Sequence, residues 1–232
     1  MKKLFLVANW KEHKTLSEAH QFMISFLGND LLSYLAKNVS VDRKIILCPS
    51  FILLPELAGL LHEFHLSGKI KLGAQNISPY PDGPHTGEVS ARQIAEFASY
   101  VIIGHSERRR EYNESDEILE KKVSAALEQN ITPIFCVSDK DEFIPSGVTL
   151  VAYEPVDAIG TGSPDDPKSA QAVASYIKEK KHIHYVLYGG SVTSRNVDLY
   201  IQQPDIDGVL VGGASLDPVE FSQIIQNANP LL

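Results

Sequence analysis

Short runs of consecutive apolar residues recur along the chain. Eight such runs occur in 232 residues, an average of one for every 29. They lack the alternation of apolar and polar positions that marks a strand with one wet face, so they are typical of parallel strands buried on both faces. The predicted strands are Leu4–Ala8, Lys44–Cys48, Ile70–Ala74, Tyr100–Ile103, Ile131–Val137, Val148–Tyr153, Tyr185–Tyr188 and Gly208–Val211.

Most of the segments between these runs are amphipathic and begin with residues that favour a helix start. Thr15 with Glu18, and Ser90 with Gln93, have the spacing of a capping box. Asp166–Pro167 and Asp217–Pro218 each place a capping carboxylate before a proline at the first helical position. Strands alternating with helices predict an α/β protein with a single (β/α)8 barrel over residues 1–232.

One connection breaks this alternation. Between the fifth and sixth predicted strands the chain has only Ser138–Gly147, which contains Pro145 and Gly147. Ten residues with these two helix breakers do not form a helix of ordinary length. We therefore expect this helix to be reduced to a short loop, with Phe143 and Ile144 covering part of the exposed wall.

Charge and cysteine content limit the class of protein. The 21 basic and 29 acidic residues give a net charge of −8, which argues against a nucleic-acid or anionic-membrane surface. Cys48 and Cys136 lie inside apolar runs without a disulfide spacing, which favours a reducing compartment. The sequence has no signal-like start and no run long enough to span a membrane. A cytoplasmic location is therefore expected.

Candidate chemistry collects where the predicted strands end. In a parallel barrel the functional face is built from the residues after each strand. These residues supply a cation, an imidazole, a carboxylate and three turns that contain glycine: Asn9–Lys11, Gly104–Arg108, Glu154, Gly189–Ser191 and Gly212–Ser215. Glu154 precedes the glycine loop Ala158–Gly162, an arrangement that suggests a general base under a lid or, alternatively, an ordinary strand–loop–helix turn.

Five motifs in this order and at barrel spacing resemble the triosephosphate isomerase family. They are NWK, GHSERR, YEPVDAIGTG, YGGSV and VGGASL, one after each of strands 1, 4, 6, 7 and 8. The resemblance implies a TIM barrel that interconverts dihydroxyacetone phosphate and glyceraldehyde 3-phosphate without metal or cofactor. It also implies that Glu154 transfers the proton, that neutral His105 polarises the carbonyl, and that Lys11 supplies a fixed positive charge.

The resemblance extends to the groups around these three. It implies that Asn9 orients the substrate and that Glu107 orients neighbouring side chains. A lid over Pro155–Gly162 is expected to exclude water. The backbone N–H groups expected to bind the substrate phosphate are those of Gly160, Ser191, Gly212 and Gly213.

A homodimer is also implied by the resemblance. The long loop Asn76–Glu88 matches the loop that inserts into the partner subunit in this family. Thr86 is then expected to reach the neighbouring active site.

Departures from the family pattern leave other functions open. Asp157 stands where the family usually has tryptophan, and Ser138–Asp139 replaces the usual Gly-Glu pair. We expect Asp157 to bond a local donor and to alter lid closure, although a barrel that binds phosphosugars without catalysis is an alternative. A phosphate-binding lyase is a further alternative. It needs a Schiff-base lysine inside a strand, whereas Lys44 and Lys71 lie near strand starts.

Overall fold

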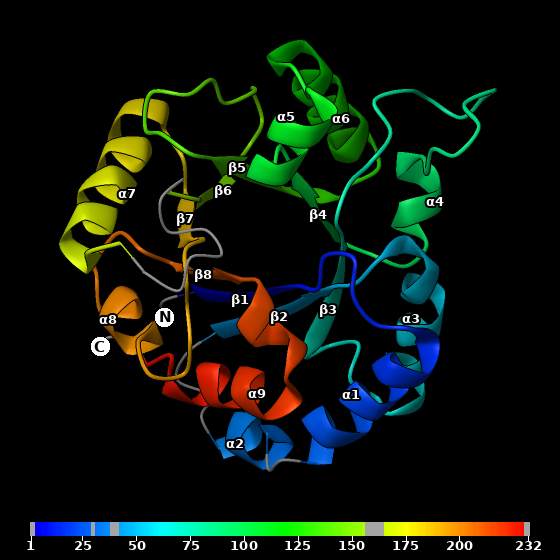
Figure 1. Cartoon of the computed structure of the whole chain (residues 1–232), viewed down its shortest axis with the longest axis vertical. Helices are drawn as coiled ribbons and strands as arrows, with labels where there is room; N and C mark the ends of the chain where they lie inside the picture. The colour runs from blue at the N-terminus through cyan, green and yellow to red at the C-terminus, as the bar shows by residue number, and fades with distance from the viewer. Residues whose placement is uncertain (1–2, 29–30, 38–41, 156–164, 230–232) are drawn as a thin grey trace.

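The predicted strands form a closed parallel barrel in the computed structural model of the chain (Figure 1). The structure describes residues 3–28, 31–37, 42–155 and 165–229. The strands pair in chain order and β8 closes on β1. They are β1 (Lys3–Asn9), β2 (Asp42–Cys48), β3 (Ile70–Ala74), β4 (Tyr100–Ile103), β5 (Thr132–Val137), β6 (Leu150–Tyr153), β7 (Tyr185–Tyr188) and β8 (Gly208–Val211). The predicted barrel is confirmed, while its extension as one domain over 1–232 stays a prediction.

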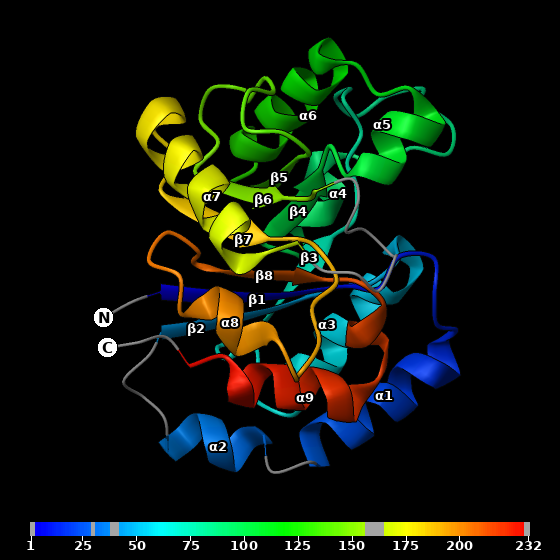
Figure 2. The ribbon, with the colours of Figure 1, turned by 60° about the vertical axis from the view of Figure 1, so that its left-hand side comes forward.

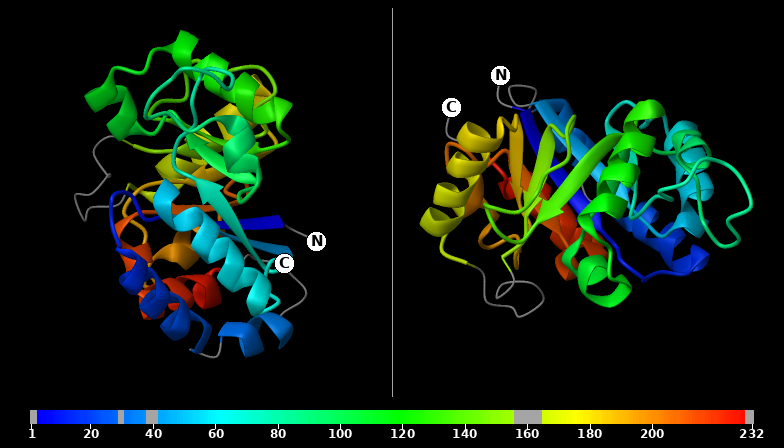
Figure 3. Two further views of the ribbon diagram at one scale, coloured as in Figure 1. Left: turned by 90° about the vertical axis from the view of Figure 1, so that its right-hand side faces the viewer. Right: turned by 90° about the horizontal axis from the view of Figure 1, so that it is seen from above.

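Helices surround the barrel on its outer side (Figures 1 and 3). The described helices are α1 (Leu16–Gly28), α2 (Leu31–Lys37), α3 (Leu54–Glu63), α4 (Ala91–Ala95), α5 (Ser106–Tyr112), α6 (Asp116–Glu128), α7 (Pro167–Lys181), α8 (Val197–Ile201) and α9 (Pro218–Asn227). Short 3-10 helices occupy Phe51–Leu53 and Gly213–Leu216. In Figure 2, β1 begins and α9 ends on the same side of the barrel, opposite the carboxyl ends of the strands.

Side chains alternate between two apolar layers along each strand. Phe5 and Val7 point into the barrel, whereas Leu4 and Leu6 pack outward against the helices. Both layers are buried, which explains why the strands read as continuous apolar runs. The inner layer also holds the thiols of Cys48 and Cys136.

The predicted helix starts are confirmed. The Ser90 side chain accepts the Gln93 N–H and forms a full capping box. Thr15 and Glu18 make the equivalent reciprocal contacts before α1. The carboxylates of Asp166 and Asp217 accept backbone N–H groups in the first turns of α7 and α9. Local sequence chemistry therefore sets where these helices begin.

The connection between β5 and β6 is the short loop that the sequence predicts. Residues 138–149, all of which the structure describes, contain no helix. Figure 1 shows this yellow-green loop between α6 and α7, which lie on either side of β5 and β6 in Figure 3. Ile144 packs against the core as expected, but Phe143 is 42% exposed. The expectation for Phe143 is therefore wrong; the neighbouring Pro145 is buried in the loop instead.

Two further expectations concern the chain as a whole. Within the described ranges, no helix is long and apolar enough to cross a membrane. Cys48 and Cys136 are both buried and unbridged.

Candidate active site

The carboxyl ends of the strands surround a cavity of about 250 Å³. The residues that line it come from the ends of β1, β4, β6, β7 and β8, and they include most of the predicted site. They are Asn9, Lys11, His105, Glu154, Gly189, Gly190, Ser191, Val192, Thr193, Leu210, Gly212, Gly213 and Ala214. A cation, an imidazole and a carboxylate therefore converge on one cavity.

Glu154 and His105 contact each other directly at the base of this cavity. The distance between Glu154 Oε1 and His105 Nε2 is 3.1 Å. The other carboxylate oxygen, Oε2, accepts the backbone N–H of Ser106 at 3.1 Å, at the start of α5. Only 2% of Glu154 and 6% of His105 is exposed. The carboxylate is thus out of bulk water and is held by two donors.

The hydrogen bonds around His105 fix its tautomer. Its Nδ1 accepts the backbone N–H of Glu107 at 3.2 Å, so the proton of the neutral ring lies on Nε2 and faces Glu154. Burial lowers the pKa of His105, but the hydrogen bond and charge of Glu154, aided by Glu107, outweigh burial and raise it above 6.5. The hydrogen bonds agree with the expected neutral ring. The raised pKa, by contrast, favours the charged ring, and its cause is the contact with Glu154.

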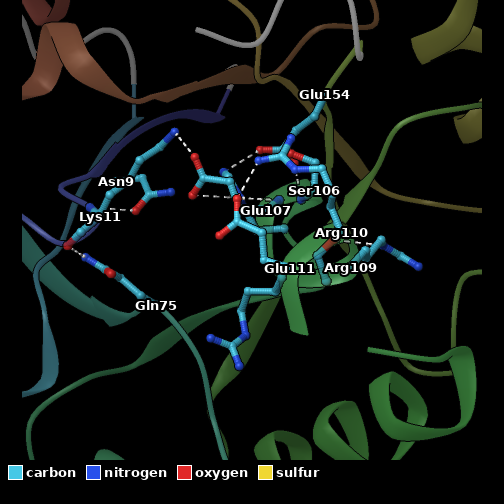
Figure 4. A network of polar contacts seen from close by, with 12 residues as sticks. Asn9, Lys11, Gln75, Ser106, Glu107, Arg109, Arg110, Glu111 and Glu154 are labelled. Atoms are coloured by element: carbon cyan, nitrogen blue, oxygen red, sulfur yellow. Dashed lines mark hydrogen bonds and ion pairs between the residues drawn. The ribbon is translucent and has the colours of Figure 1, made fainter. Parts of the chain in front are cut away.

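Lys11 reaches the other side of the cavity and is paired with a carboxylate (Figure 4). Its Nζ lies 2.5 Å from Glu107 Oε1. Burial raises the pKa of Glu107, but the hydrogen bond and charge of Lys11 and the charge of His105 outweigh it, and the pKa lies below 4.5. Asn9 Oδ1 accepts the backbone N–H of Lys11 at 3.1 Å. Glu107 therefore holds the ammonium group and also faces His105.

The backbone of Lys11 adopts a left-handed conformation with φ of 51°. The Gln75 side chain, at the end of β3, donates to the Lys11 carbonyl at 2.9 Å and to the Cys48 carbonyl at 2.8 Å (Figure 4). A non-glycine residue in this conformation is strained by roughly 1 to 2 kcal/mol. The surrounding hydrogen bonds hold Lys11 in it and direct its side chain toward the cavity.

The glycine turns after β7 and β8 form the remaining wall. Ser191, Gly212 and Gly213, which are expected to bind the phosphate, all line the cavity. A Cβ on Gly212 would lie 3.9 Å from Lys11 Nζ, so this turn and the ammonium group are neighbours. A Cβ on Gly189 would lie only 2.8 Å from Glu154 Cγ. The lack of a side chain at Gly189 therefore makes room for the carboxylate.

Two predicted residues, Gly160 and Asp157, lie outside the described residues. Asp139, the position of the family's usual acid after β5, is exposed. Its Oδ1 accepts the Asp141 N–H at 2.8 Å within the same loop.

Contacts between neighbouring strand ends add groups that the sequence reasoning missed. They are the Ser106 amide on Glu154, the Gln75 amide on Lys11, and the thiol of Cys136 beside Glu154. Burial, with the charge of Glu154, raises the pKa of Cys136 and keeps it a neutral thiol. Gln75 directly follows a predicted strand, so its position in the sequence could have identified it as a site residue. Cys136 lies inside a strand, and nothing in the sequence pattern distinguishes it from the other buried residues there.

The loop Asn76–Glu88 leaves the barrel beside α5 and α6 and extends outward (Figure 1). Its base is anchored because the buried Lys122 ammonium donates to Asn76 Oδ1 at 2.7 Å and to Glu114 Oε1 at 2.5 Å. Thr86, within this loop, is exposed.

The described residues contain no group of three or more His, Cys, Asp or Glu side chains placed to hold a metal ion.

Comparisons with known proteins point to one family. The family model described as Triosephosphate isomerase matches residues 4–150 and 145–228. The triosephosphate isomerase of Symbiobacterium thermophilum is 39% identical over 257 residues, covering 97% of this chain and 96% of the relative. That of a Synechococcus species is 38% identical, with coverage of 97% and 95%. That of Mesomycoplasma hyopneumoniae is 36% identical, with coverage of 98% and 100%.

The two matched segments overlap over residues 145–150, where the short β5–β6 loop ends and β6 begins. The match to the family model is thus divided at the connection whose residues 138–149, all described, contain no helix.

Proposed function

The chain belongs to the triosephosphate isomerase family, and we propose that Glu154, His105 and Lys11 perform the isomerisation in the described cavity. The reaction interconverts dihydroxyacetone phosphate and D-glyceraldehyde 3-phosphate through an enediolate. The observation that carries this proposal is the convergence of a buried carboxylate, an imidazole Nε2–H and an ammonium group on one cavity of about 250 Å³.

Glu154 is the base that removes a proton from the carbon beside the carbonyl and returns it to the adjacent carbon. Its carboxylate has two donors, His105 Nε2–H and Ser106 N–H. For proton transfer, one oxygen of the Glu154 carboxylate must break its hydrogen bond with one of these donors and turn to the substrate carbon. Because Glu154 is 2% exposed, little solvation opposes this exchange.

His105 donates its Nε2 proton to the carbonyl oxygen, on which charge develops. Its Nδ1 is occupied by the Glu107 N–H, so the proton is on the nitrogen that faces the cavity. The interaction that raises its pKa is the contact with Glu154. When Glu154 turns to the substrate, that contact is lost, and burial then favours the neutral ring.

Lys11 supplies positive charge to the substrate phosphate and to the enediolate oxygen. Its side chain is directed by the strained backbone at φ of 51° and by Glu107. Asn9 fixes the Lys11 backbone and lines the same cavity, where it orients the substrate. A fixed charge of this kind stabilises a developing anion without reorganisation during the reaction.

The phosphate is bound by backbone N–H groups of Ser191, Gly212 and Gly213. The cavity wall they form and the proximity of Gly212 to Lys11 support this assignment. Gly160 is the fourth donor that the family resemblance implies. No metal or cofactor takes part in this mechanism.

The partner is a second copy of the chain. The outward loop Asn76–Glu88, anchored at Asn76 by Lys122, is the segment that enters the neighbouring subunit. Its exposed Thr86 then reaches the partner's site. A cytoplasmic location is also proposed, because both cysteines are unbridged.

A coupled assay tests the function directly. The wild-type chain should convert glyceraldehyde 3-phosphate, and Glu154→Gln should lower kcat by at least roughly 100-fold because the general base is lost. A wild-type chain that binds dihydroxyacetone phosphate in a calorimeter yet converts neither triose would refute catalysis. That result would establish the binding-only alternative.

A further inference from the structure

Arg109 joins the carboxyl ends of β4 and β5 behind the candidate active site. Its Nε donates to the carbonyl of Gly104 at 2.8 Å, and its Nη2 donates to the carbonyl of Cys136 at 3.1 Å. Gly104 directly precedes His105 and has a left-handed backbone with φ of 73°. The Cys136 thiol lies beside Glu154. One guanidinium group therefore contacts the backbone next to the imidazole and the strand that borders the carboxylate.

A carboxylate from the short β5–β6 loop contacts this arginine. Glu142 Oε1 accepts the backbone N–H of Ser138 at 3.1 Å. Its Oε2 is buried, has no hydrogen-bond partner among the described residues, and lies 3.6 Å from Arg109 Nη2. A buried carboxylate oxygen needs a compensating charge, and Arg109 is the cation that supplies it.

The loop holds Glu142 in this position from several sides. The Lys181 ammonium of α7 reaches the carbonyls of Asp141 and Glu142, each at 3.4 Å. Ile144 packs on the core and Pro145 is buried. The nearby acid Asp139 is turned to the Asp141 N–H and is exposed, so it does not serve Arg109.

We propose, resting on the isomerase function above, that Glu142 is a positioning residue for the reaction. Its charge fixes the guanidinium of Arg109, and Arg109 fixes the Gly104 carbonyl and with it the Nε2 of His105 that faces Glu154. The loop that replaces a helix of the barrel thus supplies a group that sets the geometry of the site.

The test compares Glu142→Gln with Asp141→Asn. Glutamine keeps an acceptor for Ser138 N–H and removes only the charge, while the control makes the same change one residue earlier, at an exposed carboxylate bonded to Tyr176. Glu142→Gln should lower kcat by about tenfold with KM unchanged. A displacement of 1 Å in an active site costs roughly 100-fold in rate, and we expect the His105 ring to move by only part of that distance. Asp141→Asn should leave kcat and KM unchanged.

A spectroscopic readout separates positioning from general stability. The ring nitrogens of His105, assigned by their loss in His105→Gln, should shift in nitrogen-15 spectra of Glu142→Gln and not in those of Asp141→Asn. A lower melting temperature with unchanged kcat and unchanged His105 signals would overturn the positioning role. Equal changes in both variants would also overturn it.

A double variant tests the route through Arg109. Once Arg109→Lys has removed the two carbonyl contacts, adding Glu142→Gln should lower kcat no further. Additive losses would overturn action through Arg109. If the wild-type chain fails to isomerise triose phosphates, the proposed function fails, but the His105 signals still decide whether Glu142 positions the ring.

Discussion

The substitution Gly189→Ala isolates the placement of the Glu154 carboxylate. Gly189 follows β7 at the cavity wall, and its N–H donates to the Tyr153 carbonyl at 2.7 Å. An added Cβ would lie 2.8 Å from Glu154 Cγ and 3.2 Å from the Tyr153 carbonyl oxygen. The carbonyl belongs to the barrel backbone, so the Glu154 side chain is the group that has to move.

The size of the displacement follows from these distances. Two carbon atoms in contact are separated by about 3.5 Å or more, so the Glu154 methylene must move by about 0.7 Å. Because a misplacement of 1 Å costs roughly 100-fold in rate, this displacement should lower kcat roughly 20-fold. The phosphate turns and Lys11 are untouched, so KM should stay within about twofold.

Steady-state kinetics in the coupled assay, in both directions of the reaction, measure this effect. Gly59→Ala is the matched control, since a Cβ at Gly59 in α3 meets nothing within 4 Å. It should have wild-type kcat. A Gly189→Ala enzyme with wild-type kcat as well would refute the inference that Glu154 is held in its catalytic position by the lack of a side chain at Gly189.

Four further predictions concern the site, the short β5–β6 loop and the proposed lid. Lys11→Met should lower kcat/KM by at least roughly 100-fold, because it removes the fixed charge; activity near that of the wild type would exclude Lys11 from catalysis. The lowered pKa of Glu107 adds stability above about pH 4.5 that is lost as the pH falls through the folded-state pKa. Urea unfolding of Glu107→Gln should therefore show a smaller loss of stability between about pH 5 and 3 than the wild type, and identical profiles would contradict this. Hydrogen exchange should be faster in β5 and β6, beside the short loop, than in β1 to β4, and uniform protection would count against local destabilisation. Asp157→Trp should alter turnover or product release, and unchanged kinetics would contradict a role of Asp157 in lid closure.

Most of the barrel could be predicted because its strands are buried on both sides. All eight described strands fall within a few residues of the apolar runs, and β3, β4, β7 and β8 coincide with them. The site could be located for a related reason, since parallel strands bring their carboxyl ends to one face. Glu154 directly follows β6, and His105 and Lys11 lie two positions beyond the ends of β4 and β1.

Contacts between distant segments could not be predicted in this way. The Ser106 amide on Glu154, the room that Gly189 leaves for it, and the Glu142–Arg109 pair all depend on distances across the barrel. The pKa shift of His105 was missed for the same reason, because its cause is a carboxylate 49 positions further along the chain. The exposure of Phe143 depends on how the loop turns, which an apolar pair alone does not determine.

The left-handed backbone of Lys11 sets stability and activity against each other at one residue. Glycine adopts φ of 51° without steric cost, so Lys11→Gly relieves the backbone of a strained conformation, while it also removes the ammonium group. In a selection for heat resistance alone, relief of the backbone favours the loss of this lysine, and only its ion pair with Glu107 opposes that loss. A stabilised library of this barrel should keep position 11 fixed and look for its improvements elsewhere.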